Sequence, residues 1–260
     1  MEIIDFHAHI YPNGIAEKAS QATGDFYDIN PYCSGTSAEL ITFGKKAGIS
    51  RFVLLPVATK HNQVRHINEF IANEISVHKE FYGFGTLHPE CENIIGETKR
   101  IINLGLKGIK IHPDTQQFNT DDSRLFEVFD YIQGKLPLLV HCGDKRFDYS
   151  HPRRLVRVMD NFPRLKVIAA HLGGWSLFDE AFELLKDENC YLDISSTMMF
   201  LPQDQVERYI HGYGADRLLF GTDFPLWSPE QEVASFKNLH LCADEFEKIA
   251  YKNALEILNA

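Results

Sequence analysis

Short apolar segments alternate with longer amphipathic segments along all 260 residues of the chain. Each apolar segment is rich in β-branched residues and almost continuously hydrophobic, which is typical of a parallel strand buried on both faces. We expect eight such strands, within residues 2–7, 51–57, 81–88, 106–112, 136–141, 165–171, 190–195 and 217–223.

The segments between these strands show the helical spacing of apolar residues. They cover residues 68–80, 92–105, 123–134 and 202–214, and a last one covers 244–259. Gly105, Gly134 and Gly214 stand where glycine commonly ends a helix. The alternation predicts an α/β fold, a closed (β/α)8 TIM barrel with a C-terminal helix, and favours it over an open doubly wound sheet. Because no repeat, low-complexity tract or charged linker interrupts the pattern, we expect one domain over residues 1–260.

Residues 11–36 break this compact pattern, because they are rich in Gly, Pro, Asn and Ser and follow the first strand directly. We expect a long loop there. In a barrel, the loops that follow strands lie over the active site, so the segment is interpreted as a lid or a binding loop. A variable surface decoration is the alternative.

The composition, with 44% hydrophobic and 24% charged residues, is that of an ordinary globular protein. A net charge of −10 argues against a nucleic-acid partner, and no apolar run has the length needed to cross a membrane. The five cysteines are widely spaced and form no C-x-x-C pair, and no signal-peptide pattern opens the chain. We therefore expect a cytoplasmic protein with a small-molecule substrate, and a homo-oligomer stays open.

Two histidines stand at the end of the first strand, in the sequence "DFHAH". Side chains two apart in a strand point to the same side, so His7 and His9 can converge on one cation. Taken alone, H-x-H is a weak motif.

Further polar side chains stand at the carboxyl ends of other expected strands: Lys110, His112, His141, His171 and Asp223. Barrel enzymes place their catalytic groups at this end. Burying imidazoles and a carboxylate costs free energy unless they are paired or bind metal. Three imidazoles and a carboxylate suit a divalent transition metal, zinc above all.

The motifs "IDFHAH", "GIKIHP", "LLVHCG", "AAHLGG", "LLFGTDFP" and "KNALEIL" resemble the amidohydrolase superfamily, and most closely its amidohydrolase 2 branch of metal-dependent hydrolases and related decarboxylases. The resemblance implies that His7, His9 and His141 are metal ligands, and that Asp223 contacts both the metal and its water. It implies that His171 orients or deprotonates that water, or ligates a second metal in a binuclear centre.

Lys110 and His112 occupy the strand where binuclear relatives place a bridging lysine or glutamate. Lys110 is a candidate for that bridge, carbamylated or not, or for a salt bridge in the barrel mouth, and His112 for a ligand or a substrate contact. We expect one Zn²⁺ ion, with a second ion, Mn²⁺ or another divalent metal left open. Lys110, His112 and Arg146, which follows the fifth strand, are expected to bind a carboxylate-bearing substrate.

The sequence favours a metal-dependent hydrolase that uses a metal-activated water on an amide or lactone of a small carboxylate-bearing molecule. Asp223 and His171 would move the protons. A zinc-dependent, non-oxidative decarboxylase is the alternative within the same branch, and release of CO2 would distinguish it from ring opening. A non-catalytic barrel that binds a metabolite or a metal is the alternative from another class, although every expected metal position is filled.

Overall fold

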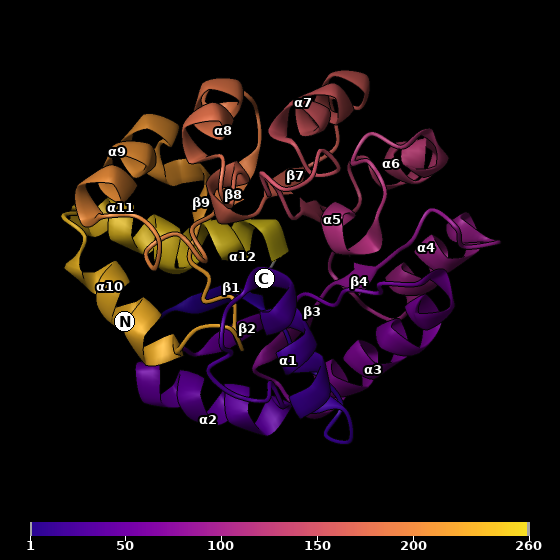
Figure 1. The fold of residues 1–260 in the computed structure, drawn as a ribbon, viewed down its shortest axis with the longest axis horizontal. Helices are drawn as coiled ribbons and strands as arrows, with labels where there is room; N and C mark the ends of the chain where they lie inside the picture. The colour runs from indigo at the N-terminus through magenta and orange to yellow at the C-terminus, as the bar shows by residue number, and fades with distance from the viewer. Residues whose placement is uncertain (1, 259–260) are drawn as a thin grey trace.

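The computed structural model describes residues 2–258 and has a barrel of parallel strands at its centre (Figure 1). The strands are β1 (Ile4–Ala8), β2 (Arg51–Leu54), β3 (Phe81–Gly83), β4 (Gly85–Thr86), β5 (Ile109–Ile111), β6 (Leu138–Val140), β7 (Val167–Ala169), β8 (Tyr191–Asp193) and β9 (Leu218–Leu219). Each of the eight predicted strand segments overlaps an observed strand, and β1 extends one residue beyond its predicted segment. One of them, at 81–88, contains both β3 and β4, which are separated by Phe84 alone.

The sheet closes on itself. Strands β1, β2 and β3 pair in that order, β4 to β9 pair in sequence order, and all of these pairings are parallel. On the far side, the amide of Phe6 donates to the carbonyl of Phe220 at 2.8 Å, and Ala8 forms a parallel bridge with Phe224. The last strand therefore lies beside the first, and the predicted (β/α)8 TIM barrel is confirmed.

Helices surround the barrel in Figure 1. They are α1 (Ala16–Tyr27), α2 (Ser37–Ala47), α3 (Val64–Val77), α4 (Ile94–Asn103), α5 (Pro113–Gln116), α6 (Phe126–Ile132), α7 (Pro152–Asn161), α8 (Phe178–Leu185), α9 (Gln203–Tyr213), α10 (Pro229–Asn238), α11 (Ala243–Glu247) and α12 (Asn253–Leu258). None of the helices in residues 2–258 combines the length and the apolar character that spanning a bilayer requires.

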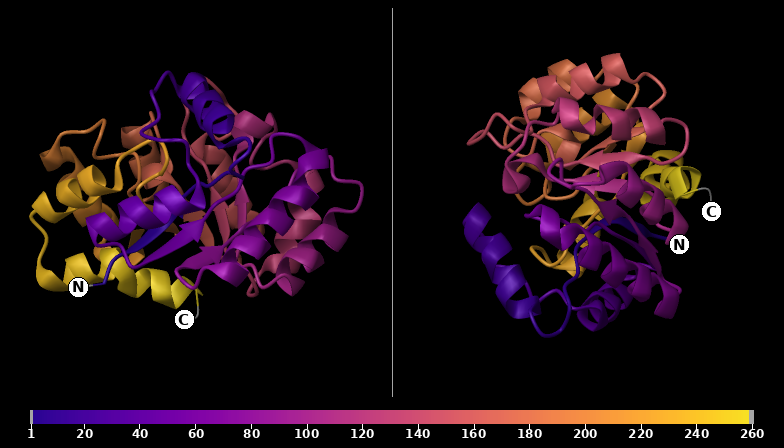
Figure 2. Two further views of the ribbon diagram at one scale, coloured as in Figure 1. Left: turned by 90° about the horizontal axis from the view of Figure 1, so that it is seen from below. Right: turned by 90° about the vertical axis from the view of Figure 1, so that its right-hand side faces the viewer.

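The predicted C-terminal helix at 244–259 is α11 and α12 joined by a π-helical turn at Lys248–Lys252. Residues 1, 259 and 260, which the predicted domain includes, lie outside the described residues. Ala254, Ile257 and Leu258 of α12 belong to the same buried cluster as Ile4, Phe6, Val53, Leu55, Phe84, Leu139, Ile168 and Leu219 from the strands. Figure 2 shows α12 at the end of the barrel opposite α1, so this helix packs against one end of the barrel and the other end is left for chemistry.

Residues 11–36 were expected to be a loop, but they contain the twelve-residue helix α1. Small and polar residues make up much of this helix, and it contains Gly24, a residue type that weakens helices. Gly24 is required there for packing. A Cβ on Gly24 would lie 2.4 Å from the carbonyl oxygen of Ile29, so only glycine lets the chain fold back there. Helix α1 stands at the end of the barrel where the strands have their carboxyl ends (Figure 2).

Candidate active site

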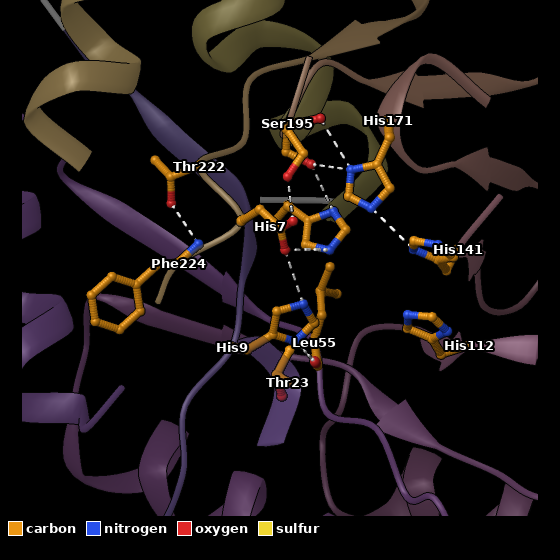
Figure 3. A network of polar contacts seen from close by, with 12 residues as sticks. His7, His9, Thr23, Leu55, His112, His141, His171, Ser195, Thr222 and Phe224 are labelled. Atoms are coloured by element: carbon orange, nitrogen blue, oxygen red, sulfur yellow. Dashed lines mark hydrogen bonds and ion pairs between the residues drawn. The ribbon is translucent and has the colours of Figure 1, made fainter. Parts of the chain in front are cut away.

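One cavity of about 1100 Å³ opens at the carboxyl ends of the strands. The polar residues predicted from strand ends line it together: His7, His9, Lys110, His112, His141, His171 and Asp223. The close-up in Figure 3 shows imidazoles from different strands turned toward a common centre. The structure therefore brings together seven of the eight residues singled out by the sequence, and only Arg146 is elsewhere.

Two of these residues have an unusual backbone. His171 has φ of +58° and Asp223 has φ of +57°, in the left-handed region that side chains other than glycine rarely adopt. Each such residue costs about 1–2 kcal/mol, and strain of this kind clusters at functional sites. Both residues were predicted to take part in the chemistry. The strained backbone therefore indicates positions where the direction of the side chain is maintained at a cost in backbone energy.

One group of possible metal donors comprises His7, His9 and Asp223, whose ligand atoms lie within 4.8 Å of one another. The Oδ1 atom of Asp223 lies 3.3 Å from His9 Nε2 and 3.6 Å from His7 Nε2. The other ring nitrogens face acceptors: His7 Nδ1 lies 2.9 Å from Asp193 Oδ2, and His9 Nδ1 lies 2.5 Å from the carbonyl oxygen of Leu55. When the proton of each ring lies on Nδ1, the lone pair of each Nε2 is left to face a metal ion beside Asp223.

This donor set fits a divalent metal ion. Ligand atoms about 2.0–2.2 Å from a tetrahedral ion lie about 3.3–3.6 Å apart, and the donor distances of Asp223 match that spacing. Outer acceptors that fix the histidine tautomer are the usual companions of a metal-binding imidazole. Asp193 is buried and serves His7 in this way.

His141, the predicted fourth ligand, lies in a neighbouring group. Its Nδ1 is 3.1 Å from Nε2 of His171, whose own Nδ1 faces the carbonyl oxygen of Ser195 at 3.0 Å. Because that carbonyl can only accept, His171 donates from Nδ1 and accepts from His141 through Nε2. The His171 lone pair is thus satisfied by His141 within the protein.

The other side of His141 faces α1 and α5. Its Nε2 lies 3.8 Å from Asp114 Oδ2 and 3.4 Å from the hydroxyl of Tyr27, which is 2.6 Å from Nε2 of His112. The His112 and His141 rings stack, with centroids 3.8 Å apart. Asp114 Oδ2 is buried and has no hydrogen-bond partner in the described part of the chain.

Sequence reasoning missed Tyr27 and Asp193. Tyr27 belongs to α1, and nothing in residues 11–36 distinguishes it as a functional residue. Asp193 could have been found, because it ends β8 just as other polar residues end their strands. The same rule applied to "CYLDIS" would have included it.

Lys110 is completely buried, with its ammonium nitrogen 3.5 Å from Nε2 of His7. Burial lowers the pKa of Lys110 to about 8, although attraction to Asp193 and Asp223 opposes the change. Most Lys110 side chains are therefore charged at neutral pH, and the ammonium lines the cavity beside the possible metal donors.

Burial sets the protonation of the imidazoles. It lowers the pKa of His171 to about 4 and holds the pKa values of His112 and His141 well below the usual range. Burial alone would raise the pKa of Asp223, but attraction to His7 and a hydrogen bond with His9 hold it well below normal. Neutral imidazoles and an ionised carboxylate are the forms that bind metal and accept protons.

Arg146 was expected to bind a substrate carboxylate, but its guanidinium group has partners within the protein. It forms a fork with buried Asp144, at 3.0 Å from Nε to Oδ1 and 2.6 Å from Nη2 to Oδ2, and it donates to the carbonyl of Phe26 at 2.5 Å. Phe26 belongs to α1 and its ring also lies against the guanidinium. Arg146 therefore ties α1 to the loop after β6, and its expected contact with a substrate carboxylate stays a prediction.

The family comparison covers almost the whole chain. The model of the amidohydrolase family, in its amidohydrolase 2 branch, matches residues 4–260. Two curated relatives are similar to shorter parts of the chain. The decarboxylase orsB of Emericella nidulans is 28% identical over 39% of this chain and 36% of its own length. The 2-amino-3-carboxymuconate-6-semialdehyde decarboxylase of Dictyostelium discoideum is 26% identical over 75% of this chain and 66% of its own length. The chain thus spans about a third and just under two thirds of these relatives.

Solved structures share the fold across their full length. A TIM-barrel protein of Bordetella bronchiseptica has a TM-score of 0.82 at 21% identity, covering 100% of this chain and 99% of that one. The 5-carboxyvanillate decarboxylase of Sphingomonas paucimobilis has a TM-score of 0.77 at 16% identity, with 99% of both chains covered. A dihydroxybenzoic acid decarboxylase of Polaromonas sp. JS666, with bound manganese and the inhibitor 2-nitroresorcinol, has a TM-score of 0.77 at 17% identity, covering 99% of this chain and 97% of that one.

Proposed function

This chain belongs to the amidohydrolase family, in its amidohydrolase 2 branch, and we propose that within the family it is a metal-dependent, non-oxidative decarboxylase of a small carboxylated molecule. The observation that carries the proposal is the convergence of His7 Nε2, His9 Nε2 and Asp223 Oδ1 at the wall of a large cavity. We propose one barrel domain over residues 1–260 as the unit of function. The cysteines, all free, support a reducing compartment such as the cytoplasm.

The comparisons support decarboxylation better than the hydrolysis favoured by the sequence motifs. Both curated relatives are named as decarboxylases, and so are two of the structures that share the fold. The sequence motifs indicate a metal site and the residues that transfer protons beside it. Hydrolases and decarboxylases of this branch have both features in common, so the motifs do not distinguish the two reactions. Hydrolysis therefore becomes the competing outcome of the test below.

We propose that His7, His9 and Asp223 hold a divalent metal, with His141 as a fourth ligand on the strength of its family resemblance. Manganese in the Polaromonas decarboxylase supports Mn²⁺ as well as Zn²⁺, and a second ion is not needed by the donor set. A divalent metal at this place would polarise substrate oxygens and stabilise negative charge on them.

The chain's own residues would manage charge and protons. Loss of CO2 breaks a carbon–carbon bond and leaves its electron pair on the substrate carbon, which must take up a proton. Asp223 and His171 face the cavity and are proposed to relay that proton. Lys110 is proposed to pair with a substrate carboxylate through its buried ammonium, and His112 to hydrogen-bond the substrate beside it.

The test uses protein loaded with Mn²⁺ or Zn²⁺ and a panel of hydroxybenzoic acids labelled with ¹³C at the carboxyl carbon. Labelled CO2 and deuterium from D2O at the vacated carbon are expected. His171→Asn should lower turnover by about 10²–10⁴-fold, the usual contribution of a proton-transfer group, while metal content stays stoichiometric. Ring opening of lactones or cleavage of amides without CO2 from any acid would overturn the proposal in favour of hydrolysis.

A further inference from the structure

The cavity is larger than the chemistry at its inner end requires. The same continuous space that touches the histidines and Asp223 extends outward between α1 and α3. This outer part, here called the apolar arm, is lined by Ile15, Ala19 and Ala22 on one side and by Ile67, Phe70 and Ile71 on the other. It therefore connects the proposed reaction centre to the space between two helices.

The lining follows helical periodicity on both sides. Ile15 precedes α1 directly, and Ala19 and Ala22 follow it at intervals of four and three residues, which places them on one face. Ile67, Phe70 and Ile71 stand at positions i, i+3 and i+4 of α3, which also places them on one face. Ile15 is 55% exposed, an unusual state for such a large apolar side chain. Two apolar faces thus border one space.

The side chains that carry the proposed chemistry lie at the inner end, whereas the lining from α1 and α3 is mostly apolar but includes Lys18 and His66. Pockets of about 300–1000 Å³ hold drug-sized ligands, and this cavity of about 1100 Å³ exceeds what one ring with a carboxylate fills. The small side chains of Ala19 and Ala22 keep the arm open. A ligand that fills the cavity has a polar, reacting end and an apolar remainder.

We propose that the substrate is an aromatic or unsaturated acid with an apolar substituent remote from its reacting carboxylate, and that this substituent lies in the apolar arm. The inference rests on the proposed function, since it takes the histidine end as the place where the carboxylate reacts. A second copy of this chain could also cover apolar side chains. Continuity of the arm with the histidine cluster favours the substrate.

The experiment measures binding rather than turnover. The probes are 2-nitrophenols with linear alkyl chains of no, two, four or six carbons, in which the nitro group replaces the carboxylate and cannot leave as CO2. Calorimetric titration of Mn²⁺-loaded protein should show affinity rising up to about fourfold for each methylene buried in the arm.

Two matched variants place the effect. Ala22→Phe fills the arm from an exposed position, so it needs no rearrangement of the core. It should abolish the gain from the long chains while the unsubstituted nitrophenol binds within twofold of its original affinity. Gln21→Phe adds the same ring one residue away on α1, at an exposed position outside the cavity lining, and should leave the whole series unchanged.

Failure of the inference differs from failure of the proposed function. Equal affinity across the alkyl series, or equal loss of all probes in Ala22→Phe, would overturn the apolar arm even if labelled CO2 is released. An Ala22→Phe protein that binds every probe normally but changes its sedimentation coefficient would overturn the arm in favour of a second copy. Chain-length-dependent binding without CO2 from any acid would overturn decarboxylation and retain the arm.

Discussion

The carboxylate of Asp193 is expected to control the metal affinity of His7. Asp193 Oδ2 accepts from His7 Nδ1 at 2.9 Å, whereas its Oδ1 accepts from the Ser195 hydroxyl and from the amides of Ser195 and His171. Asp193→Asn keeps the Oδ1 bonds if the amide oxygen takes that place. The amide NH2 then faces His7 Nδ1, and two donors meet.

The magnitude follows from this donor clash. His7 can relieve it by moving its proton to Nε2, but that nitrogen then presents N–H to Asp223 instead of a lone pair. Loss of such an outer partner typically weakens metal binding by about 10–100-fold, which corresponds to about 1.4–2.7 kcal/mol. Since Asp193 is buried, metal-free protein should also lose about 1–2 kcal/mol of stability.

Competition with a chromophoric chelator measures the affinity for Zn²⁺ or Mn²⁺, and urea unfolding of metal-free protein measures the stability. Asp144→Asn is the matched control, because Asp144 is a buried carboxylate whose partner is Arg146 rather than a metal donor. It should leave metal affinity unchanged. If Asp193→Asn binds metal within threefold of the parent protein while folded, His7 does not depend on this tautomer and the reasoning is refuted.

Three further outcomes are expected. Arg146→Lys keeps a positive charge beside Asp144 but loses the guanidinium group that also donates to the Phe26 carbonyl. Hydrogen exchange of the α1 amides should therefore accelerate, while exchange of the α3 amides should not change. Unchanged exchange in α1 would contradict the inference that Arg146 holds this helix. Glu232 is buried with both carboxyl oxygens unbonded within the described residues, and burial, then repulsion from Asp223 and Asp5, raises its pKa well above 4.5. Because the folded state keeps this proton, the free energy of unfolding falls as pH rises above the pKa that Glu232 has in the unfolded chain. In that pH range the stability of Glu232→Gln relative to the parent protein should rise by up to about 1.4 kcal/mol per pH unit. Urea unfolding at about pH 5.5 and about pH 7.5 measures the difference in stability between the two proteins, and a difference that does not change with pH would contradict the prediction. Chelation should abolish CO2 release and added Mn²⁺ or Zn²⁺ should restore it, whereas activity in metal-free protein would exclude His7, His9 and Asp223 as essential metal donors.

The strands were predictable because both of their faces are buried. A segment such as "LPLLVH" has no polar face, so its hydrophobicity is continuous and its polar end is conspicuous. The rule that strand ends carry chemistry placed His141 and Asp223 in one cavity from sequence alone. The rule was not applied to Asp193, which ends β8 in the same way.

The lid region was harder, because its structure depends on contacts with distant parts of the chain. Helix α1 contains Gly24 and has exposed small residues along the cavity, so its sequence resembles a loop. The position of Arg146 depends in turn on the carbonyl of Phe26, which belongs to that unpredicted helix. When the partner of a side chain is a backbone atom far away in the sequence, no sequence pattern predicts the contact.

The barrel closure places the first and last strands side by side, and this has a consequence for biogenesis. His7 and Asp223 meet only after nearly the whole barrel has been synthesised. Drawing together positions so distant carries an entropic cost that grows with the length of the intervening loop, and a cation held by both would offset part of it. A ribosome-bound or truncated polypeptide that ends before residue 223 therefore lacks Asp223, one of the four proposed ligands, so full metal affinity would be reached only when the barrel is complete.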